Sequence, residues 1–508
     1  MPHHSPTLAR LAMTVLQPGF DGTAPPDWLR RALSEGLGGA VLFARNLAGP
    51  AQTAELVAGM RRENPAVVVA VDEEGGAVTR LEARTGSSWP GNRALGVAGD
   101  AERTERVARE IGRLLAAADI TLDYAPVVDV NANPANPVIG IRSFGPDPEL
   151  VSRQTTAWIT GLQGAGVAAC AKHFPGHGDT VTDSHHALPT VHADLGLLQE
   201  RDLPPFRAAV KAGVQAVMCG HLLVPALDPG NPATLSRRIL TGLLREEMGF
   251  GGMLVTDAIE MGAVAALHPP GEIAVRALAA GVDAICVGVS SAGGESVYAL
   301  RDAIVRAVHD GRLPEERLAE AAGRVLALAG WYAENAAARA RDTEAPEGRG
   351  GRDPRGEGEE LGLQAARAAM RVTVAGDRTA PPPVLSRPPL VVDIAPRLNL
   401  AIDPSTPTGL VGAMTELLPG TTGHTVAAET ADLPDLSDHR RPLVLVAHDA
   451  PRHAWVRDLL ARAVGLRPDA IVIETGLPGE PTGAVHIATH GISRVSARAA
   501  ALWLTGGQ

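Results

Sequence analysis

The sequence predicts an α/β protein in which a (β/α)8 TIM-type barrel is followed by a smaller α/β domain. Three observations predict this class. Short apolar runs of strand length alternate with segments of helical period over the first two thirds of the chain. A stretch rich in glycine, proline and charge follows at residues 334–360. A second, shorter alternation fills the remainder, and 508 residues are enough for two domains.

The first alternation contains eight candidate strands, the number that closes a parallel barrel. We expect them at residues 11–16, 39–43, 67–72, 122–130, 167–172, 216–221, 253–257 and 283–288. Segments of helical period separate them, at residues 26–35, 51–63, 101–118, 148–165, 204–212, 236–248 and 271–280. Two further helices, near 295–310 and 314–329, are expected to complete the barrel.

The remainder of the chain predicts a linker and a second domain. We expect a catalytic barrel domain at residues 1–335, an exposed, flexible linker at 336–360 and a C-terminal α/β domain at 361–508. In the last of these, a helix at 361–370 precedes apolar runs at 372–375, 390–394, 443–447, 471–474 and 485–488. Helical segments near 409–418, 454–464 and 492–504 alternate with them, which favours a mainly parallel open sheet.

Composition excludes several classes of function. The net charge of −11 argues against a nucleic-acid partner, which usually requires a basic patch. No apolar run approaches the roughly 18–20 residues that span a bilayer, so no membrane partner is expected. The N-terminus has no signal-peptide pattern, and we expect a cytoplasmic protein. Cys170, Cys219 and Cys286 each lie in a short apolar run, which is typical of buried free thiols.

Polar residues stand where five of the predicted strands end. These are Asp72 in the run DEEGG, Asp129, the pair Lys172 and His173, His221, and Asp257 after the run GGMLVT. The carboxyl ends of barrel strands form one rim, so residues far apart in sequence are expected to meet in one cleft.

The richest stretch is residues 172–189, KHFPGHGDTVTDSHHALP, which follows an apolar run. Its many titratable side chains, on a loop spaced by glycine and proline, are typical of a catalytic loop on a rigid scaffold. Asp183 and His185 are two residues apart, so in an extended segment they share a face. A carboxylate beside an imidazole fixes its tautomer, raises its pKa and lets it pass a proton near neutral pH.

This stretch resembles the signature of glycoside hydrolase family 3, in the β-N-acetylglucosaminidase branch that includes bacterial peptidoglycan-recycling enzymes. The run KHFPGHG is widespread in that family, and Asp183, Ser184 and His185 match the triplet that marks the branch. The run VTDAIEM around Asp257 resembles the family's nucleophile segment. The resemblance covers residues 8–335 well and the C-terminal part only loosely.

The resemblance implies a role for each matching position. Asp257 matches the catalytic nucleophile, which stabilises an oxocarbenium-like transition state and bonds to the sugar. His185 matches the acid/base, with Asp183 behind it, in place of the second carboxylate of most retaining glycosidases. The positions that match substrate-binding residues are Asp72, Arg80, Arg142, Lys172 and His173. The chain departs from the family's usual Asp-Gln-Glu-Gly-Gly-Arg at Glu73 and Ala77.

We therefore expect a retaining exo-β-N-acetylglucosaminidase that removes terminal GlcNAc from muropeptide or chitooligosaccharide substrates by double displacement. No cofactor and no metal are expected, the partner is a GlcNAc-containing sugar, and the protein is a monomer or homodimer. Because Asp183 and His185 supply the acid/base, no catalytic residue is expected from residues 361–508. A phosphorylase that uses phosphate as acceptor is an alternative, because a histidine repels phosphate less than a carboxylate does. A metal-dependent hydrolase using His173, His177, Asp179 and His185, and a non-catalytic sugar-binding module, are weaker alternatives.

Overall fold

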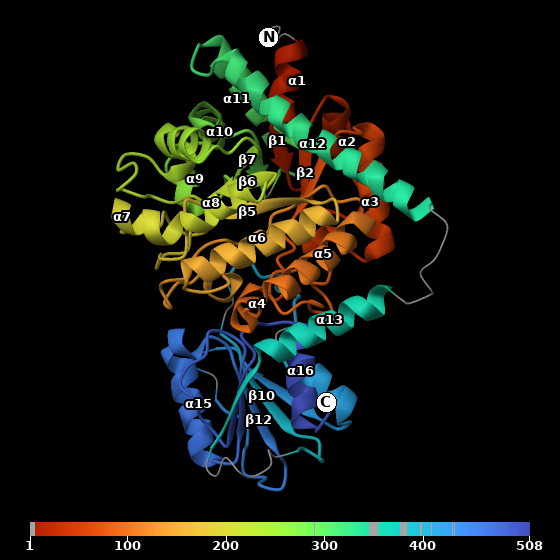
Figure 1. The fold of residues 1–508 in the computed structure, drawn as a ribbon, viewed down its shortest axis with the longest axis vertical. Helices are drawn as coiled ribbons and strands as arrows, with labels where there is room; N and C mark the ends of the chain where they lie inside the picture. Colours follow the sequence, from red (N-terminus) through yellow and green to blue (C-terminus); the bar gives the residue numbers. More distant parts are fainter. Residues whose placement is uncertain are drawn as a thin grey trace. The chain divides into compact units, whose positions relative to one another are not determined.

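The structure is a computed structural model that describes residues 6–288, 290–344, 354–375, 384–396, 399–407, 409–428, 430 and 432–507. The described residues group into two units, which are considered separately (Figure 1). Unit 1 comprises Met1–Glu73, Thr104–Ile139 and Pro146–Gly350. Unit 2 comprises Glu74–Arg103, Gly140–Gly145 and Gly351–Gln508. Two segments that the sequence assigns to the barrel domain are thus grouped with the C-terminal part of the chain.

Unit 1 contains the predicted barrel. Its strands are β1 (Leu16–Pro18), β2 (Gly39–Leu42), β3 (Val68–Val71), β4 (Leu122–Asp123), β5 (Ala168–Phe174), β6 (Ala216–Cys219), β7 (Met253–Thr256) and β8 (Ile285–Val287). Strands β2 to β7 form a parallel sheet in chain order, and β1 pairs in parallel with β8. Single parallel bridges, Gly19 to Val41 and Val255 to Ala284, join the two sheets at both seams. The eight strands therefore close into the barrel that the sequence predicts.

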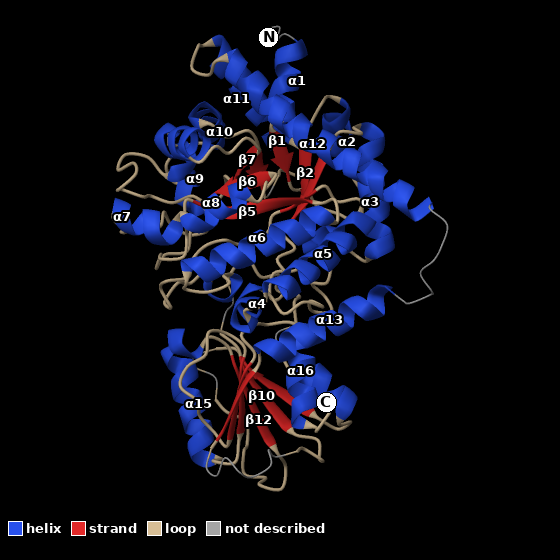
Figure 2. Ribbon diagram, in the orientation of Figure 1, coloured by secondary structure: helices blue, strands red, loops and turns tan. Residues whose placement is uncertain are grey.

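Helices surround these strands, as Figure 2 shows for the upper part of the drawing. They include α2 (Asp27–Ser34), α3 (Pro50–Glu63), α5 (Ala101–Ala117), α6 (Pro148–Gly164), α8 (Pro204–Lys211), a π-helix (Arg238–Glu247), α10 (Pro270–Ala280), α11 (Glu295–His309) and α12 (Glu315–Glu344). Each lies within a few residues of its predicted position, except that α12 continues well beyond residue 329. Shorter helices follow some strands, among them α9 (Gly262–Ala265) after β7.

Two predicted strands were wrong in extent. Residues 11–14 belong to helix α1 (Pro6–Thr14), and the first strand begins only at Leu16. Leu8 and Ala12, which are one helical turn apart, are both buried. The run at 11–16 is too short for its apolar residues to reveal this helical spacing. Strand β4 ends at Asp123, not at residue 130, because Pro126 cannot donate to a sheet ladder.

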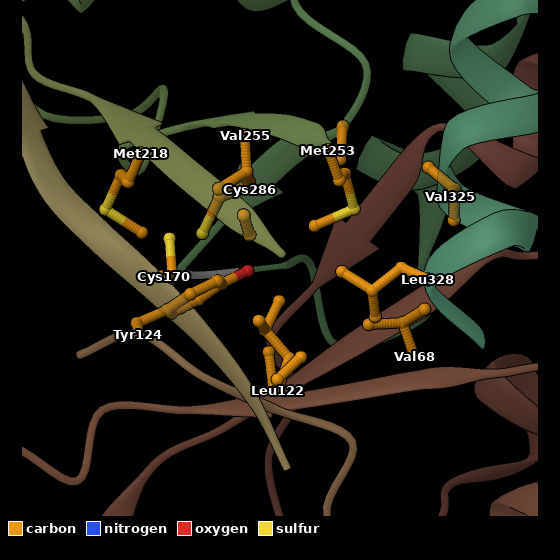
Figure 3. Packing of buried hydrophobic residues seen from close by; sticks show 14 of the residues in the cluster. Val68, Leu122, Tyr124, Cys170, Met218, Met253, Val255, Cys286, Val325 and Leu328 are labelled. Atoms are coloured by element: carbon orange, nitrogen blue, oxygen red, sulfur yellow. The ribbon is translucent and has the colours of Figure 1, made fainter. Parts of the chain in front are cut away.

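The barrel interior is filled with side chains (Figure 3). Val68, Leu122, Cys170, Met218 and Cys286 lie in one buried cluster with residues of the other strands. All three cysteines are free and buried, as the sequence predicts. Val325 and Leu328 of α12 join the same cluster, so this helix closes one end of the barrel.

An arginine cluster fixes α12 to the start of β8. Asp283 has no exposed surface and lies two residues before β8. Its Oδ1 accepts from Arg317 Nη2 over 2.7 Å and from Arg324 Nη1 over 3.2 Å, both on α12. Its Oδ2 pairs with Arg245 and accepts from the Leu254 N–H over 2.9 Å. Because β8 begins here, α12 closes the barrel at the amino ends of its strands.

Unit 2 contains a six-stranded sheet in the order β11-β10-β12-β13-β14-β9. The strands are β9 (Arg371–Val374), β10 (Leu390–Ile394), β11 (Thr422–Val426), β12 (Leu443–Ala447), β13 (Ile471–Glu474) and β14 (Val485–Ala488), with β9 alone antiparallel to its neighbour. Helix α15 (Ala454–Leu466) packs on one face. Helices α14 (Val411–Leu417) and α16 (Arg494–Leu504) pack on the other, so the predicted mainly parallel open sheet is present.

The expected linker is partly helical. Residues 336–344 continue α12, and residues 354–360 begin α13 (Pro354–Ala369). Residues 345–353 lie outside the described residues. Among the helices of the described ranges, none combines the length and apolar character needed to cross a membrane.

The segments 74–103 and 140–145 pack into unit 2. Ala77 and Val78 form a buried cluster with Ile402 and Ile492, and Ile141 packs against it. Helix α4 (Asn92–Ala98) lies in the first of these segments. Both segments follow barrel strands, β3 and β4, in the chain.

Candidate active site

Strand β5 carries Lys172 and His173 and contains an irregularity between them and Phe174. Lys172 is paired with Met218 of β6, and Phe174 with the next residue, Cys219, so His173 is the extra residue of a β-bulge. Bulges change the direction of a side chain and are frequent beside active sites. Both Lys172 and His173 are buried.

Lys172 reaches across the barrel rim to the residue that follows β3. Its Nζ donates to Asp72 Oδ1 over 2.7 Å, and the Lys172 side chain is 2% exposed against 20% for Asp72. A buried ammonium needs such a carboxylate to offset its loss of hydration. The structure thus brings together two of the residues predicted to bind substrate.

Asp129 holds the next pair. This carboxylate has no exposed surface, and its Oδ2 lies 2.8 Å from His173 Nδ1. Its Oδ1 accepts from the backbone N–H of His177 over 2.7 Å. An ionised carboxylate fixes the proton of His173 on Nδ1 and leaves Nε2 for other contacts. Sequence reasoning placed Asp129 at a strand end but missed this role.

Asp183 and His185 form the predicted pair. His185 Nδ1 lies 2.6 Å from Asp183 Oδ1, which also accepts from the His185 backbone N–H over 2.9 Å. The His185 side chain is 24% exposed and the Asp183 side chain is 16% exposed. Burial opposes ionisation of Asp183, but the two hydrogen bonds and the charge of His185 outweigh it and lower its pKa. The carboxylate therefore keeps the ring proton on Nδ1, and Nε2 is the atom available for proton exchange.

The loop that carries this pair is attached to the loop after β7. The N–H of Gly262 donates to His185 O over 3.1 Å, and the N–H of Ala263 donates to Ser184 O over 3.2 Å. A Cβ at Gly262 would lie 2.7 Å from His186 O, so only glycine permits this approach. Both residues begin helix α9, five residues after Asp257. The segment with His185 and the segment with Asp257 thus form one packed rim.

Asp257 follows β7 directly and keeps some solvent exposure. Burial opposes its ionisation, but the rings of His173 and His221, with two further influences, hold the pKa of Asp257 below its ordinary value. The Ala258 N–H, which donates to Asp257 Oδ1 over 2.8 Å, and the His185 ring act in the same direction. A carboxylate that stays ionised among imidazoles is suited to attack or to stabilise a cationic carbon.

His221, two residues after β6, supports this group. Its Nε2 lies 3.0 Å from the Ala258 carbonyl oxygen, which can only accept, so Nε2 carries a proton. Nδ1 lies 2.7 Å from Thr234 Oγ1, and burial lowers the pKa of the ring. The strand-end pattern pointed to His221, although no role was assigned to it.

Arg80 and Arg142 both belong to unit 2. Arg142 binds Glu74 through two parallel hydrogen bonds, Nε to Oε2 over 2.9 Å and Nη2 to Oε1 over 2.7 Å, with both side chains nearly fully buried. This bidentate pair is a strong, directional contact. Glu74 in the run DEEGG was not predicted as its partner. Arg80 is 8% exposed.

The residues proposed for a metal-dependent hydrolase have other hydrogen-bond partners. His177 Nδ1 lies 2.7 Å from Thr180 Oγ1, and burial lowers the pKa of its ring to about 4. Asp179 pairs with Arg201 over 2.9 Å. Within the described part of the chain, no three histidine, cysteine, aspartate or glutamate side chains are grouped as ligands of one metal ion.

Comparison with known proteins finds a matching family model and several named relatives. Residues 24–328 match the model of the glycosyl hydrolase family 3 N-terminal domain. Beta-hexosaminidase A of Pseudoalteromonas piscicida is 33% identical over 331 residues, which are 60% of this chain and 55% of that protein. The chain thus spans little more than half of this relative's length. A beta-hexosaminidase of Xanthomonas euvesicatoria is 38% identical over 285 residues, which are 54% of this chain and 82% of the relative.

A solved structure extends the likeness to both units. A glycoside hydrolase family 3 β-N-acetylglucosaminidase from a Paenibacillus species is 36% identical, with a TM-score of 0.85 over 98% of this chain and 96% of that one. A β-glucoside phosphorylase matches 98% of this chain with a TM-score of 0.76, but at 17% identity it shows the fold alone. Because the family model matches more than half of its length, and the structural relative supports the match, the chain belongs to glycosyl hydrolase family 3.

Proposed function

We propose that this protein is a retaining β-N-acetylglucosaminidase that releases terminal GlcNAc from muropeptide or chitooligosaccharide substrates. The observation that carries the proposal is the attachment of the Asp183–His185 loop to the segment after Asp257, through Gly262 and Ala263. It gives one rim an ionised carboxylate and a separate imidazole with an available Nε2. The relatives named β-hexosaminidase and β-N-acetylglucosaminidase support the choice of sugar.

The mechanism assigns one task to each group. Asp257 attacks the anomeric carbon while His185, protonated on Nε2 and braced by Asp183, gives that proton to the leaving oxygen. The glycosyl–Asp257 ester forms as the bond from the anomeric carbon to the leaving oxygen breaks. His185 then takes a proton from water as the water attacks the same carbon, which breaks the ester bond and releases the Asp257 carboxylate. Because two inversions occur in sequence, the sugar keeps its β configuration. Asp183 stabilises the imidazolium of the resting enzyme, as a carboxylate behind a catalytic histidine does.

Sugar hydroxyls are assigned to the polar residues at the other strand ends. An ionised carboxylate such as Asp72 accepts from hydroxyl groups, and Lys172 and His173 present donors beside it. Arg80 and Arg142 stay predicted substrate contacts. Glu74 already accepts from Nε and Nη2 of Arg142. Arg142 would therefore contact sugar through its remaining N–H groups, or act indirectly by holding Glu74 in position.

One measurement tests the proposal directly. Proton NMR during hydrolysis of 4-nitrophenyl β-GlcNAc records which anomer appears before mutarotation. The proposal requires the β-anomer of GlcNAc first. Release of the α-anomer would show inversion and exclude Asp257 as the nucleophile, and hydrolysis of the glucoside but not of the GlcNAc substrate would exclude the proposed sugar.

A further inference from the structure

Unit 2 contains a buried histidine whose ring lacks hydrogen-bond partners. His490 follows β14 and is 6% exposed, and among the described residues neither Nδ1 nor Nε2 has a hydrogen-bond partner. Buried polar atoms are almost always hydrogen-bonded, so an exception needs an explanation. The backbone φ of His490 is +55°, in the left-handed region. Non-glycine residues held there are concentrated at binding and active sites.

The neighbouring residue fixes this loop against the start of helix α4. A Cβ placed on Gly491 would lie 2.4 Å from Pro90 O and 3.9 Å from the Ala94 Cβ. The loop at 490–491 therefore packs directly on the segment that carries Arg93. Arg93 is partly buried, and its Nη1 donates to Phe144 O over 3.4 Å. Its Nε is buried without a partner, and it forms no ion pair among the described residues.

A second arginine, Arg371, also contacts helix α4. Arg371 begins β9, and its Nη2 donates to Val97 O, at the end of the same helix α4, over 3.0 Å. Burial, then Arg93 and Arg371, lower the pKa of His490 to about 4. The ring is therefore neutral at pH 7, and both charges that act on it are positive. A partly buried guanidinium without a counter-ion is unfavourable, so this place favours an anion.

We propose that Arg93, His490 and Arg371 bind the carboxylate of a small molecule within unit 2. Arg93 Nε and one His490 nitrogen donate to the two carboxylate oxygens, and Arg371 adds positive charge. Arg371 already donates to Ala368 O and Val97 O, so few donors remain. Two donors match the two oxygens of a carboxylate, whereas a dianionic phosphate needs more. This inference is independent of the proposed glycosidase activity.

The test follows the full-length protein with 13C-labelled histidine Cε1 positions. The His490 resonance is identified by its disappearance in His490→Gln. Sodium acetate is titrated against sodium phosphate and sodium chloride at constant ionic strength. We expect a saturable shift of the His490 resonance with acetate, at millimolar concentration, and none with chloride. Arg93→Met should weaken acetate binding at least about tenfold, which corresponds to the loss of one charge-assisted contact.

The control variant is Arg462→Gln, on the exposed face of α15, where acetate binding should be unchanged. Circular dichroism and the remaining histidine resonances show whether each variant is folded. If Arg93→Met does not fold, Arg93→Lys replaces it, because it keeps the charge and loses the Nε donor. No acetate-dependent shift, or equal binding in the Arg93 variant, overturns the site. Saturable binding of phosphate in preference to acetate overturns its assignment to carboxylates.

Discussion

Asp183 holds His185 at two points, through the backbone N–H over 2.9 Å and the ring Nδ1 over 2.6 Å. This double contact fixes both the position and the tautomer of the imidazole. The Nε2 atom of His185 therefore has a defined position. The chemical roles of His185, Asp183 and Asp257 can then be separated by substrates that differ in their need for a proton.

His185→Ala should slow hydrolysis of a GlcNAc disaccharide by about 10²–10⁴-fold, because the leaving sugar oxygen needs a proton. The loss in glycosylation should be much smaller for 2,4-dinitrophenyl β-GlcNAc, whose leaving group departs unprotonated. Steady-state kcat/KM for the two substrates measures the difference. Asp183→Asn should also lower kcat/KM more for the disaccharide than for the dinitrophenyl substrate, but both losses should be smaller than in His185→Ala. Equal losses on both substrates would count against the acid role.

Asp257→Ala should lower kcat by about 10⁴-fold or more, because the variant lacks the carboxylate that is proposed to form the glycosyl ester. The matched control is Glu260→Ala, three residues along and exposed, which should keep activity within a few-fold. Thermal unfolding of both variants verifies the fold. Full turnover in the Asp257 variant would remove this residue from the mechanism.

Asp129→Asn should change the pH profile. The folded-state pKa of Asp257 lies below its ordinary value, so its carboxylate is kept ionised to lower pH than in the unfolded chain. His173 is the largest of the influences that lower the pKa of Asp257, and Asp129 holds the His173 ring in place through Oδ2, 2.8 Å from Nδ1. If the amide introduced by Asp129→Asn holds the ring less firmly, the pKa of Asp257 should rise, and the acid limb of kcat/KM should move to higher pH. The acid limb is measured between pH 3 and 7 with an aryl substrate, and an unmoved or lowered limb contradicts the proposed role of Asp129.

Asp283→Asn should destabilise unit 1 by about 3–5 kcal/mol, the usual cost of removing one partner from a buried charge cluster. Arg317 and Arg324 on α12 would lose the carboxylate with which both form ion pairs. Urea unfolding measures the free energy change. Glu247→Gln, which breaks the exposed pair with Arg207, serves as the control and should change stability by less than about 0.5 kcal/mol. A change of similar size in both variants would show that the cluster contributes little.

Phosphate should not replace water as the acceptor. We expect turnover of 4-nitrophenyl β-GlcNAc to release GlcNAc at the same rate with and without phosphate, because the proposed base activates a neutral nucleophile. Product analysis by mass spectrometry distinguishes GlcNAc from its 1-phosphate. Phosphate-dependent acceleration together with the sugar phosphate would support the phosphorylase alternative.

Apolar runs predicted the elements that lie in the two cores. In unit 2, the expected strands 390–394, 443–447, 471–474 and 485–488 coincide with β10, β12, β13 and β14. Strand β11 was missed because it lies at the sheet edge, where four of its five residues are exposed and its sequence, TGHTV, has no apolar run. Helix α1 was read as a strand, since a short apolar run has no distinct period.

Side-chain contacts within one stretch of sequence could be predicted better than contacts between separate stretches. Asp183 and His185 are close in the chain, so their contact could be expected from spacing. Asp129 and Glu74 act through partners 44 and 68 residues away, and no local pattern reports such a contact. The same applies to the grouping of residues 74–103 and 140–145 with unit 2, which depends on tertiary packing.

The cluster of Ala77 and Val78 with Ile402 and Ile492 limits how this chain can be shortened. A protein truncated at residue 344 would keep both alanine and valine but lose the isoleucines that cover them. Newly wetted apolar side chains of this kind promote self-association. A barrel prepared alone for crystallisation or engineering would therefore need polar substitutions in the segments 74–103 and 140–145 to remain monomeric.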